Sequence, residues 1–428
     1  MLLAMQFQLG QSQWRDPADL RQQQFRQCAN LLAHAIRTVP FYGEHFRAAG
    51  FDPAQGWIRP EAWAQLPFLQ REHIQRYGDA LRSRQLPPDH GRVVDYTTSG
   101  STGSPIRFCK SEITYLFWRA LTLRDHLWHQ RDLDGKLTAI RTTTNETEGA
   151  GWGPATDQIF DTGFCATLNI RSDIDAQAIW LERQNPDYLL SHPSNILALA
   201  KRCLETGIHL PRLNQVRTFG ETLMLGLREA CLKAWGATLA DVYSAEEVGY
   251  IALQCAAHEH YHIQSESLLV EILDEMGQPC SPGEIGKVVI TTLHNFAMPL
   301  IRYEVGDYAE LGEPCPCGRG LPVLKRIMGR QRNLLTLPDG RQHWPSFPAE
   351  GWLPIAPVRQ FQLVQRDLEH IEARFVADRP VTADEKQRLA AMLHEYLRYP
   401  FRIDFVQLER IERKPNCKFE DFISEVAR

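Results

Sequence analysis

The chain has 428 residues, of which 43% are hydrophobic and 23% charged, a composition typical of globular proteins. The chain is longer than a domain with a single compact core usually is, so its length predicts two domains. The formal net charge of −5 argues against nucleic acid or an anionic membrane as the main partner. The chain contains no run of about 18 apolar residues, so we expect no membrane span.

Residues 1–10 lack a basic segment followed by a long apolar one, so we expect no signal peptide and a cytoplasmic location. Thiols stay mostly reduced in that compartment. Apart from Cys315 and Cys317, the ten cysteines are scattered. We expect four of them to be small buried hydrophobic side chains: Cys28, Cys165, Cys203 and Cys231.

Helical spacing over residues 21–37 ends before Pro40. The next informative stretch is 96–105, in which hydroxyl side chains alternate with two glycines and a proline closes the run. Glycines let the backbone turn tightly against a ligand, and hydroxyls with exposed amides can bind an anion. The stretch predicts a polyphosphate-binding loop, although an ordinary Ser/Gly surface loop is the alternative. No lysine follows the second glycine, so it is not the GxxxxGK[ST] loop.

The middle of the chain alternates predicted helices (173–185, 193–207 and 222–235) with predicted strands (216–219 and 238–242). This alternation favours a largely parallel sheet. Ligands of such sheets gather beyond the carboxyl ends of the strands. Gly220, Glu221 and residues 243–247 fall at strand ends, where we expect a nucleotide site.

Two later patterns differ from this one. Residues 268–273 and 286–293 read as strands of an antiparallel, barrel-like subdomain. After Gly329, strands at 360–365, 370–376 and 402–408 surround a helix that a capping box opens at Thr382. The fold class predicted is therefore α/β, with a large N-terminal domain over residues 1–329 and a small α+β domain over residues 330–428.

Five segments in this order resemble the motifs of the adenylate-forming, or acyl-CoA synthetase, superfamily. They are the 96–105 loop, residues 241–249 (DVYSAEEVG), residues 300–307 (LIRYEVGD), Gly329-Arg330 and Lys418. The phenylacetate-CoA ligase branch is the most similar, because the chain also carries VPFY at 39–42 and CPCGR at 315–319. The resemblance covers most of the chain, from roughly residue 20 onward.

The resemblance implies an ATP-dependent carboxylic acid ligase whose C-terminal domain is mobile. The product would be an acyl-adenylate, formed with release of pyrophosphate, and then an acyl-CoA thioester. Transfer to a carrier-protein thiol or an amine is an alternative, and so is adenylyltransfer that stops at the AMP adduct, as in coenzyme F390 synthetases. A non-catalytic nucleotide-binding relic is a third. A homodimer is possible within this family.

The resemblance also assigns roles to single residues. Lys418 is the expected catalytic lysine, Arg332 occupies the hinge, and Glu247 holds magnesium, with Glu246 as a rival one residue away. The expected ATP-binding residues are Thr98, Ser99, Gly100, Ser101, Thr102, Gly103, Gly220, Glu221, Asp241, Tyr243, Ser244, Asp307 and Arg330. Asp307 would accept both ribose hydroxyls. For the arginines and Lys418, an ordinary surface position is the alternative.

The chemistry explains why these groups are needed. The attacking carboxylate is already an anion and needs no general base. The difficulty is to hold two anions together and to offset charge in the transition state. Loop amides, a divalent ion and a lysine can do this.

Two positions depart from the family pattern. Ser104 stands where its phosphate loops usually carry lysine, and Lys110 is a candidate substitute. Cys417 precedes Lys418 in place of glycine, and its Cβ restricts the backbone.

Two short Cys/His clusters predict a structural zinc ion. Cys255 and His258 at one end, with Cys315 and Cys317 at the other, make a Cys₃His set, and four protein ligands leave no open position. His260 and His262 are alternative ligands, and free cysteines beside surface histidines are the alternative to a site.

The acid itself is not named by the sequence. Four aromatic side chains lie in the segment where the family builds its acyl pocket: Trp118, Trp128, Trp152 and Phe164. They favour a flat aryl acid, and ordinary core packing is the alternative. The expected substrate is therefore an aryl acid or another small organic acid.

Overall fold

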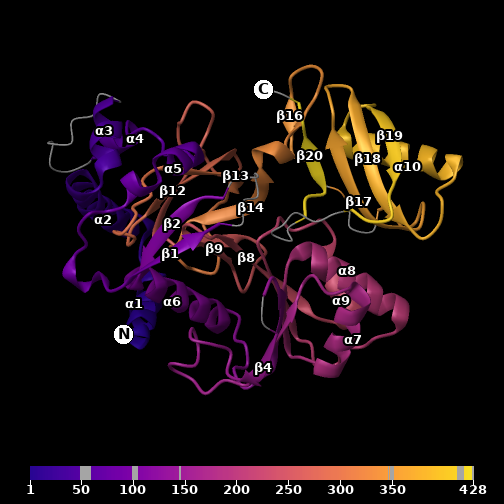
Figure 1. Cartoon of the computed structure of the whole chain (residues 1–428), viewed down its shortest axis with the longest axis horizontal. Helices are drawn as coiled ribbons and strands as arrows, with labels where there is room; N and C mark the ends of the chain where they lie inside the picture. The colour runs from indigo at the N-terminus through magenta and orange to yellow at the C-terminus, as the bar shows by residue number, and fades with distance from the viewer. Residues whose placement is uncertain are drawn as a thin grey trace. The chain divides into compact units, whose positions relative to one another are not determined.

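The computed structural model describes residues 1–48, 59–98, 105–143, 146–345, 347, 351–411 and 419–426, without the side chain of Gln331. These residues divide into two compact units, each discontinuous in sequence (Figure 1). The first unit comprises Met1–Gly135, Ala150–Phe164 and Val242–Ile327, and the second comprises Lys136–Gly149, Cys165–Asp241 and Met328–Arg428. None of the described helices combines the length and the apolar character that crossing a bilayer requires.

The helices of the first unit are α1 (Leu2–Ser12), α2 (Pro17–Thr38), α3 (Pro40–Ala48), α4 (Pro60–Ala64), α5 (Arg71–Tyr77) and α6 (Glu112–Trp128), with 3₁₀ turns at Gly78–Leu81 and Pro88–His90. Helix α2 contains the predicted 21–37 segment. Asp16 caps its N-terminus by accepting a hydrogen bond from the Ala18 amide at 2.8 Å, and it ends just before Pro40 because proline has no amide to continue the helix.

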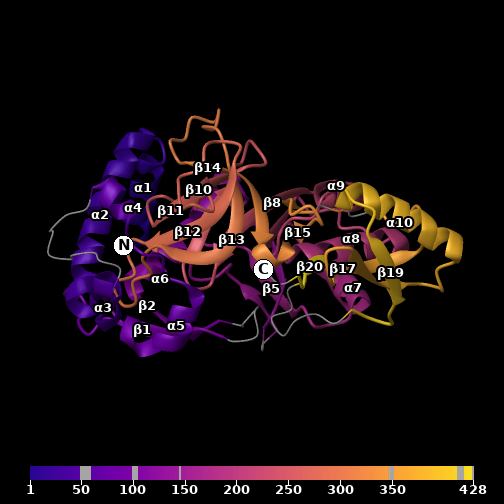
Figure 2. The ribbon, with the colours of Figure 1, turned by 90° about the horizontal axis from the view of Figure 1, so that it is seen from above.

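The strands of the first unit are β1 (Val93–Thr97), β2 (Arg107–Ser111), β9 (Gly249–Gln254), β10 (Tyr261–Ile263), β11 (Leu268–Leu273), β12 (Ile285–Thr292) and β13 (Tyr303–Leu311). Strands β8 (Thr238–Ala245) and β14 (Val323–Arg330) have residues in both units. The hydrogen-bonded order is β11-β12-β13-β14-β10-β9-β8, and the predicted antiparallel pairing is confirmed for β11 with β12 and for β12 with β13. Helix α2 contributes buried residues to the main core, which also contains residues of β11 and β12. Figure 2 shows the ribbon of this unit from above.

The second unit contains the predicted parallel strands. They are β3 (Leu137–Arg141), β5 (Phe164–Asn169, beginning in the first unit), β6 (Tyr188–Ser191) and β7 (Gln215–Phe219), with the short β4 (Thr147–Ala150) beside β5. Strand β3 is parallel to β5 and β6, and β6 to β7. One core joins these strands to α7 (Ile174–Gln184), α8 (Pro193–Thr206) and α9 (Leu227–Trp235). Helix α9 begins five residues later than predicted, after Gly226 at φ 83°.

The C-terminal part of this unit is a four-stranded sheet in the order β19-β18-β17-β20. Its elements are β17 (Val358–Gln365), β18 (His370–Ala377), α10 (Ala383–Leu397), β19 (Arg402–Gln407) and β20 (Phe422–Ser424), preceded by a 3₁₀ turn at Gln331–Asn333 and a hairpin of β15 (Leu335–Thr336) and β16 (Gln342–His343). The predicted capping box of α10 is present, with Thr382 and Glu385 bonded reciprocally. The mixed α/β fold with a C-terminal α+β part is thus confirmed.

The cysteines in the described part of the chain are free thiols. Cys28, Cys203 and Cys231 are buried as predicted. Cys165 is only partly buried, because it lies beside the exposed Phe164 at the start of β5.

Candidate active site

The phosphate-loop candidate connects two strands of a hairpin. Strands β1 and β2 pair antiparallel up to Thr97 opposite Arg107. Thr98 is buried and closes the base of the hairpin: its amide donates to the Ile106 carbonyl at 2.9 Å, and its Oγ1 accepts from the Ile106 amide at 3.1 Å. Ser99, Gly100, Ser101, Thr102, Gly103 and Ser104 lie outside the described residues.

Tyr243 and Asp307 come from motifs 64 residues apart and meet in the first unit. The Tyr243 hydroxyl donates to Asp307 Oδ2 at 2.9 Å, and Tyr243 is 7% exposed. Gly306 precedes Asp307 at φ 85°, a conformation that favours glycine. One carboxylate oxygen of Asp307 is therefore oriented by a buried tyrosine. Ser244 follows Tyr243 at a register shift in the pairing of β8 with β9.

The two glutamates proposed as metal ligands differ in their surroundings. Glu247 is 5% exposed, and its Oε1 accepts a hydrogen bond from the fully buried Tyr303 hydroxyl at 3.1 Å. Glu246 is exposed, and its backbone carbonyl accepts from Lys110 Nζ at 2.6 Å. A buried carboxylate with a single neutral donor is the more suitable of the two for a divalent cation.

Lys110 lies on β2, close to these glutamates. Burial lowers the pKa of its ammonium to about 8, although attraction by Glu247 and then Glu246 opposes the shift. The ammonium also lies 5.7 Å from the ring centre of Tyr96 and 5.4 Å from that of Phe108. Lys110 is thus a cation at the edge of the carboxylate site, held by the Glu246 carbonyl.

Arg302, the arginine of the 300–307 segment, is a structural residue. It is 1% exposed at φ 48°, and its Nη1 donates to the Ala64 and Leu66 carbonyls at 2.7 and 2.6 Å. Its Nε and Nη2 pair with Glu271 at 3.3 Å each, and Phe68 covers the guanidinium at 4.4 Å. These contacts tie α4 and the chain after it to β11 and β13.

The second unit carries the adenine-site candidates Gly220 and Glu221, at the end of β7. Gly220 has φ 81°. The Glu221 carboxylate accepts from the amide and hydroxyl of Ser194 at 2.9 and 3.1 Å and from the Phe419 amide at 2.7 Å. Asp241 is buried and accepts from the Thr218 hydroxyl at 2.6 Å, so it joins β8 to β7 rather than facing solvent.

The hinge candidates lie in the same unit. Gly329 has φ 91°, and a Cβ there would meet Thr222 Oγ1 at 2.9 Å. The Arg330 amide donates to Asn333 Oδ1 at 3.0 Å. Arg332 pairs with Glu420, with Nε 2.8 Å and Nη2 2.5 Å from Oε1. Cys417 and Lys418 lie outside the described residues, and Phe419 after them is the nearest described position.

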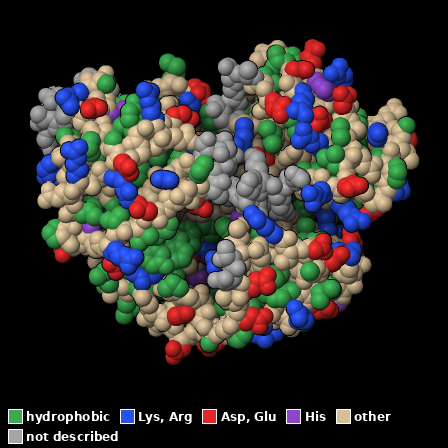
Figure 3. All heavy atoms as spheres, in the orientation of Figure 1, with side chains coloured by type: hydrophobic (Ala, Val, Ile, Leu, Met, Phe, Trp, Pro, Cys, Tyr) green, Lys and Arg blue, Asp and Glu red, His purple; other side chains and the backbone are tan. Residues whose placement is uncertain are grey.

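A cavity of about 30 Å³ in the first unit is the candidate acyl pocket. Its lining includes Lys110, Phe117, Trp118, Tyr250, His294 and Asn295. Phe117 stacks on His294 with ring centres 4.0 Å apart, and Trp118 is parallel to Tyr250 at 6.4 Å. Figure 3 shows hydrophobic side chains gathered over β1 and α6. The exposed large hydrophobic residues of these two elements are Val94, Tyr96, Tyr115, Trp118 and Leu127.

Of the four aromatic residues predicted to line this pocket, only Trp118 does so. Trp128 is a core residue that donates to Gln13 Oε1 at 2.8 Å, Trp152 donates to the Gly135 carbonyl at 3.0 Å, and Phe164 is 42% exposed. The sequence reading missed Phe117, His294 and Asn295. No motif marked them, since His294 and Asn295 lie outside the 300–307 segment.

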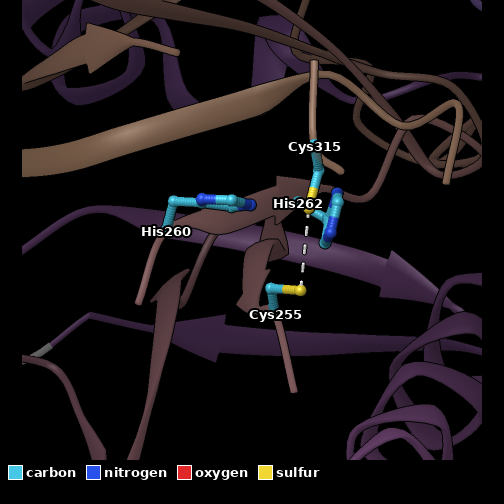
Figure 4. Close-up of side chains that lie close together, drawn as sticks. All are labelled: Cys255, His260, His262 and Cys315. Carbon is cyan, nitrogen blue, oxygen red and sulfur yellow. Dashed lines mark hydrogen bonds between the residues drawn. The ribbon is translucent and has the colours of Figure 1, made fainter. Parts of the chain in front are cut away.

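A cluster of thiols and imidazoles forms where β9, β10 and the Cys315 loop meet (Figure 4). One ligand atom from each of Cys255, His260, His262 and Cys315 lies within 4.8 Å of the others. The Cys255 and Cys315 sulfurs are 3.9 Å apart, and Cys317 Sγ is 3.4 Å from His262 Nε2. His258, which the sequence reading included, is exposed and stacks on His260 instead.

Three side chains of the cluster, Cys255, His260 and His262, come from the two sides of a tight turn. The Cys255 amide donates to the His260 carbonyl at 2.9 Å, and Tyr261 pairs with Gln254 across the hairpin. His258 lies at the tip of this turn, while His260 and His262 return alongside Cys255. The cluster therefore contains His260 and His262, the alternative residues, and does not contain His258.

No protein-family model matches this chain. It is 25% identical over 416 residues to the phenylacetate-coenzyme A ligase of Thermus thermophilus, covering 92% of this chain and 89% of the relative. It is 24% identical over 330 residues to that of Pseudomonas putida, covering 74% and 72%.

Among solved structures, 2-hydroxyisobutyryl-CoA ligase in the postadenylation state superposes with a TM-score of 0.76 at 17% identity, over 97% of this chain and 92% of that one. An anthranilate CoA ligase gives a TM-score of 0.55 at 15% identity, over 76% and 65%. The chain thus has the fold of the CoA ligases of the adenylate-forming superfamily. Its curated relatives within that superfamily are the phenylacetate-coenzyme A ligases.

Proposed function

We propose that this protein is an AMP-forming acid–CoA ligase. In the first step a carboxylate oxygen of the acid attacks the α-phosphorus of ATP, and pyrophosphate leaves with the electron pair of the broken P–O bond. In the second step the CoA thiol loses its proton and attacks the acyl carbon, and AMP leaves. The products are an acyl-CoA thioester, AMP and pyrophosphate.

The observation that carries the proposal is the convergence of two motifs in the first unit. Asp307 accepts a hydrogen bond from the Tyr243 hydroxyl. Glu247, which lies four residues after Tyr243, accepts one from the Tyr303 hydroxyl. Strands β8 and β13 thereby bring a candidate ribose acceptor and a candidate cation ligand to one place, as adenylation requires. The full-length similarity to a phenylacetate-coenzyme A ligase supports the same activity.

In this proposal Asp307 accepts the ribose hydroxyls and Tyr243 orients it. Glu247, whose Oε1 accepts from the Tyr303 hydroxyl, would hold a magnesium ion, and the ion would supply charge neutralisation at the phosphates. Residues 98–103 bind the β- and γ-phosphates, Gly220 and Glu221 border adenine, and Lys418 stabilises the charge that develops in the first step. Arg330 reaches phosphate or ribose, and Arg332 marks the hinge at residues 329–330 of a mobile C-terminal domain.

CoA is the acceptor we propose. A cavity of about 820 Å³ lies within the second unit, between α7, α8 and the C-terminal strands, and it is large enough for a cofactor-sized ligand. Its lining carries both cations, such as Lys201 and Arg410, and acids, and Arg359 is paired with Asp378, so its size is what makes it a candidate. A carrier-protein thiol or an amine would be the acceptor if CoA gave no thioester.

We also propose a structural zinc ion at the Cys/His cluster. Ligands on one zinc ion, at bond lengths of about 2.0–2.3 Å and tetrahedral angles, lie about 3.3–3.8 Å apart. The separations of 3.9 Å between Cys255 and Cys315 and 3.4 Å between Cys317 and His262 are close to this range. Cys255, His262 and Cys315 would bind the ion with one of two flanking side chains, His260 or Cys317. His260 Nε2 is buried without a hydrogen-bond partner among the described residues, as an empty ligand atom would be.

The test of the function is ATP–pyrophosphate exchange with a panel of carboxylic acids, followed by mass spectrometry of the products after CoA is added. We expect acid-dependent exchange and an acyl-CoA product. An AMP adduct that persists with CoA present would favour adenylyltransfer, and exchange with none of the acids would contradict the proposal. Cell fractionation and size-exclusion chromatography test the proposed cytoplasmic location and a homodimer.

A further inference from the structure

Asn295 presents an unused hydrogen-bond acceptor at the candidate acyl pocket. It is 2% exposed, it lines the 30 Å³ cavity, and its Oδ1 has no hydrogen-bond partner in the part of the chain that the structure describes. A buried polar atom without a partner costs about 1–3 kcal/mol. Such an atom at a cavity is more easily explained if a ligand satisfies it.

The orientation of the Asn295 amide is fixed by its other end. Its Nδ2 donates to the Cys109 carbonyl at 3.0 Å. Rotating the amide by 180° would place its oxygen against that carbonyl oxygen, two acceptors in contact, so the assignment follows from the hydrogen bond. The group presented to a ligand is therefore an acceptor, and the ligand must donate.

Lys110 restricts which donor fits. Its ammonium lines the same cavity and uses one of its three protons on the Glu246 carbonyl. A ligand ammonium would be repelled by this cation, whereas a hydroxyl can donate to Asn295 and accept from Lys110. The pair therefore favours a hydroxyl over an amine.

The cavity also limits the size of the acyl group. A water molecule needs roughly 10–15 Å³ of this kind of space, so about 30 Å³ accommodates two or three water-sized groups of the acid. The stacked pair of Phe117 and His294 closes one wall, and the His294 ring is held by the Glu266 carbonyl, 2.9 Å from Nε2. A phenyl ring would have to displace this wall.

We propose that the acid activated by this protein is a small hydroxy acid, whose hydroxyl donates to Asn295 and accepts from Lys110. The proposal rests on the ligase function above and names its substrate class. It makes Asn295 the specificity-determining residue. The aryl acid that the aromatic residues favoured at the level of sequence is replaced by an acid of a few carbons.

The experiment is ATP–pyrophosphate exchange by the full chain with acids that differ only in a hydroxyl. The pairs are propionate with lactate, butyrate with 3-hydroxybutyrate, and isobutyrate with 2-hydroxyisobutyrate, with alanine as the amine probe and phenylacetate as the size probe. We expect kcat/KM at least about tenfold higher for the hydroxy acid of one or more pairs, and lower values for alanine and phenylacetate. The magnitude corresponds to one buried acceptor left unpaired.

Asn295→Leu tests the residue, with Thr114→Val as a matched control. Thr114 lines the same cavity, but its hydroxyl is paired with Ser111 Oγ at 3.3 Å. We expect Asn295→Leu to bring the hydroxyl preference to within about twofold of unity, while Thr114→Val keeps it. Thermal unfolding of both variants shows whether each is folded. If Asn295→Leu does not fold, the comparison of acids with the wild-type protein still decides the substrate class.

Each outcome has one meaning. Preference for hydroxy acids in the wild type, lost in Asn295→Leu, supports the proposal. Exchange that is equal within every pair, or fastest with phenylacetate, overturns it and leaves the ligase function intact. Exchange with no acid overturns both.

Discussion

Glu221 accepts a hydrogen bond from the backbone amide of Phe419 at 2.7 Å. Glu221 belongs to the adenine-site candidates at the end of β7, and Phe419 follows the expected catalytic lysine, Lys418, directly. The same carboxylate also receives the amide and hydroxyl of Ser194 at the start of α8. One side chain thus fixes the chain position next to the lysine to the end of the parallel sheet.

Loss of this anchor should impair the first half-reaction. Glu221→Ala removes a charged acceptor from three donors, and each such hydrogen bond contributes about 1.5–3 kcal/mol. We expect ATP–pyrophosphate exchange to fall at least tenfold in Glu221→Ala, whereas Lys418→Ala should abolish exchange and still form thioester from preformed acyl-AMP at a near wild-type rate. Stopped assays of the two half-reactions measure this. Unchanged exchange in Glu221→Ala, or equal loss of both half-reactions in Lys418→Ala, would refute the assignment for that residue.

Asp307→Ala should weaken ATP binding. It removes the acceptor of two ribose hydroxyls, at about 1–3 kcal/mol for each group left unpaired, so we expect affinity at least tenfold lower in calorimetry. Tyr243→Phe is the matched control, because it keeps the ring and removes only the hydrogen bond that orients Asp307. A loss of about fivefold is expected there. Unchanged affinity in Asp307→Ala would show that the ribose lies elsewhere.

The zinc proposal predicts about one zinc ion per chain in protein purified without chelator. Cys255→Ser should lose the ion and lower the melting temperature, because structural zinc contributes directly to folding. Cys280→Ser is the control, since Cys280 is a buried thiol outside the cluster. Zinc content of His260→Ala and Cys317→Ser identifies the fourth ligand. Less than about 0.2 zinc per wild-type chain would contradict the site, because such sites do not empty on purification.

The pH dependence of stability should include a contribution from Asp421. Burial raises the pKa of this carboxyl to about 6 from the ordinary 3.8, and the charges of Glu221 and Glu420 add to the shift. Between about pH 4 and pH 6 the folded chain keeps a proton that the unfolded chain has lost, so stability decreases as the pH rises through this window.

Asp421→Asn removes this titration. We expect the variant to be more stable than the wild type by about 2 kcal/mol at pH 7.5, allowing for partial exposure of the side chain, and nearly equal to it at pH 4. Denaturant unfolding at the two pH values measures the difference. A gap that is the same at both values would show that Asp421 does not titrate in this range.

The order of the elements could be predicted from the sequence because local signals are strong in this chain. An aspartate cap marks the start of α2 and a proline follows its end, and a capping box starts α10. The start of α9 was wrong by five residues, because residues 222–226 have a helical composition but Gly226 takes a left-handed conformation. No pattern of apolar residues reveals such a backbone turn.

The site could be predicted only where a motif carried it. Asp307 and Tyr243 meet through two strands that the motifs already marked. Trp128 and Trp152 were placed at the acyl pocket by their position along the chain, yet they pack elsewhere, because an aromatic residue has the same signature in a core and in a pocket. Asn295 could not be recognised at all, since its importance lies in a missing partner, which only the folded chain defines.

Arg302 has a consequence for how sequences of this fold are interpreted. Its guanidinium is engaged by Glu271 and by two carbonyls near the end of α4, so natural selection for a folded chain alone would retain it. A pseudoenzyme that had lost every nucleotide contact would still need this arginine. Arg302 therefore reports on the fold of the chain, and Asp307, five positions later, is the better indicator of nucleotide binding.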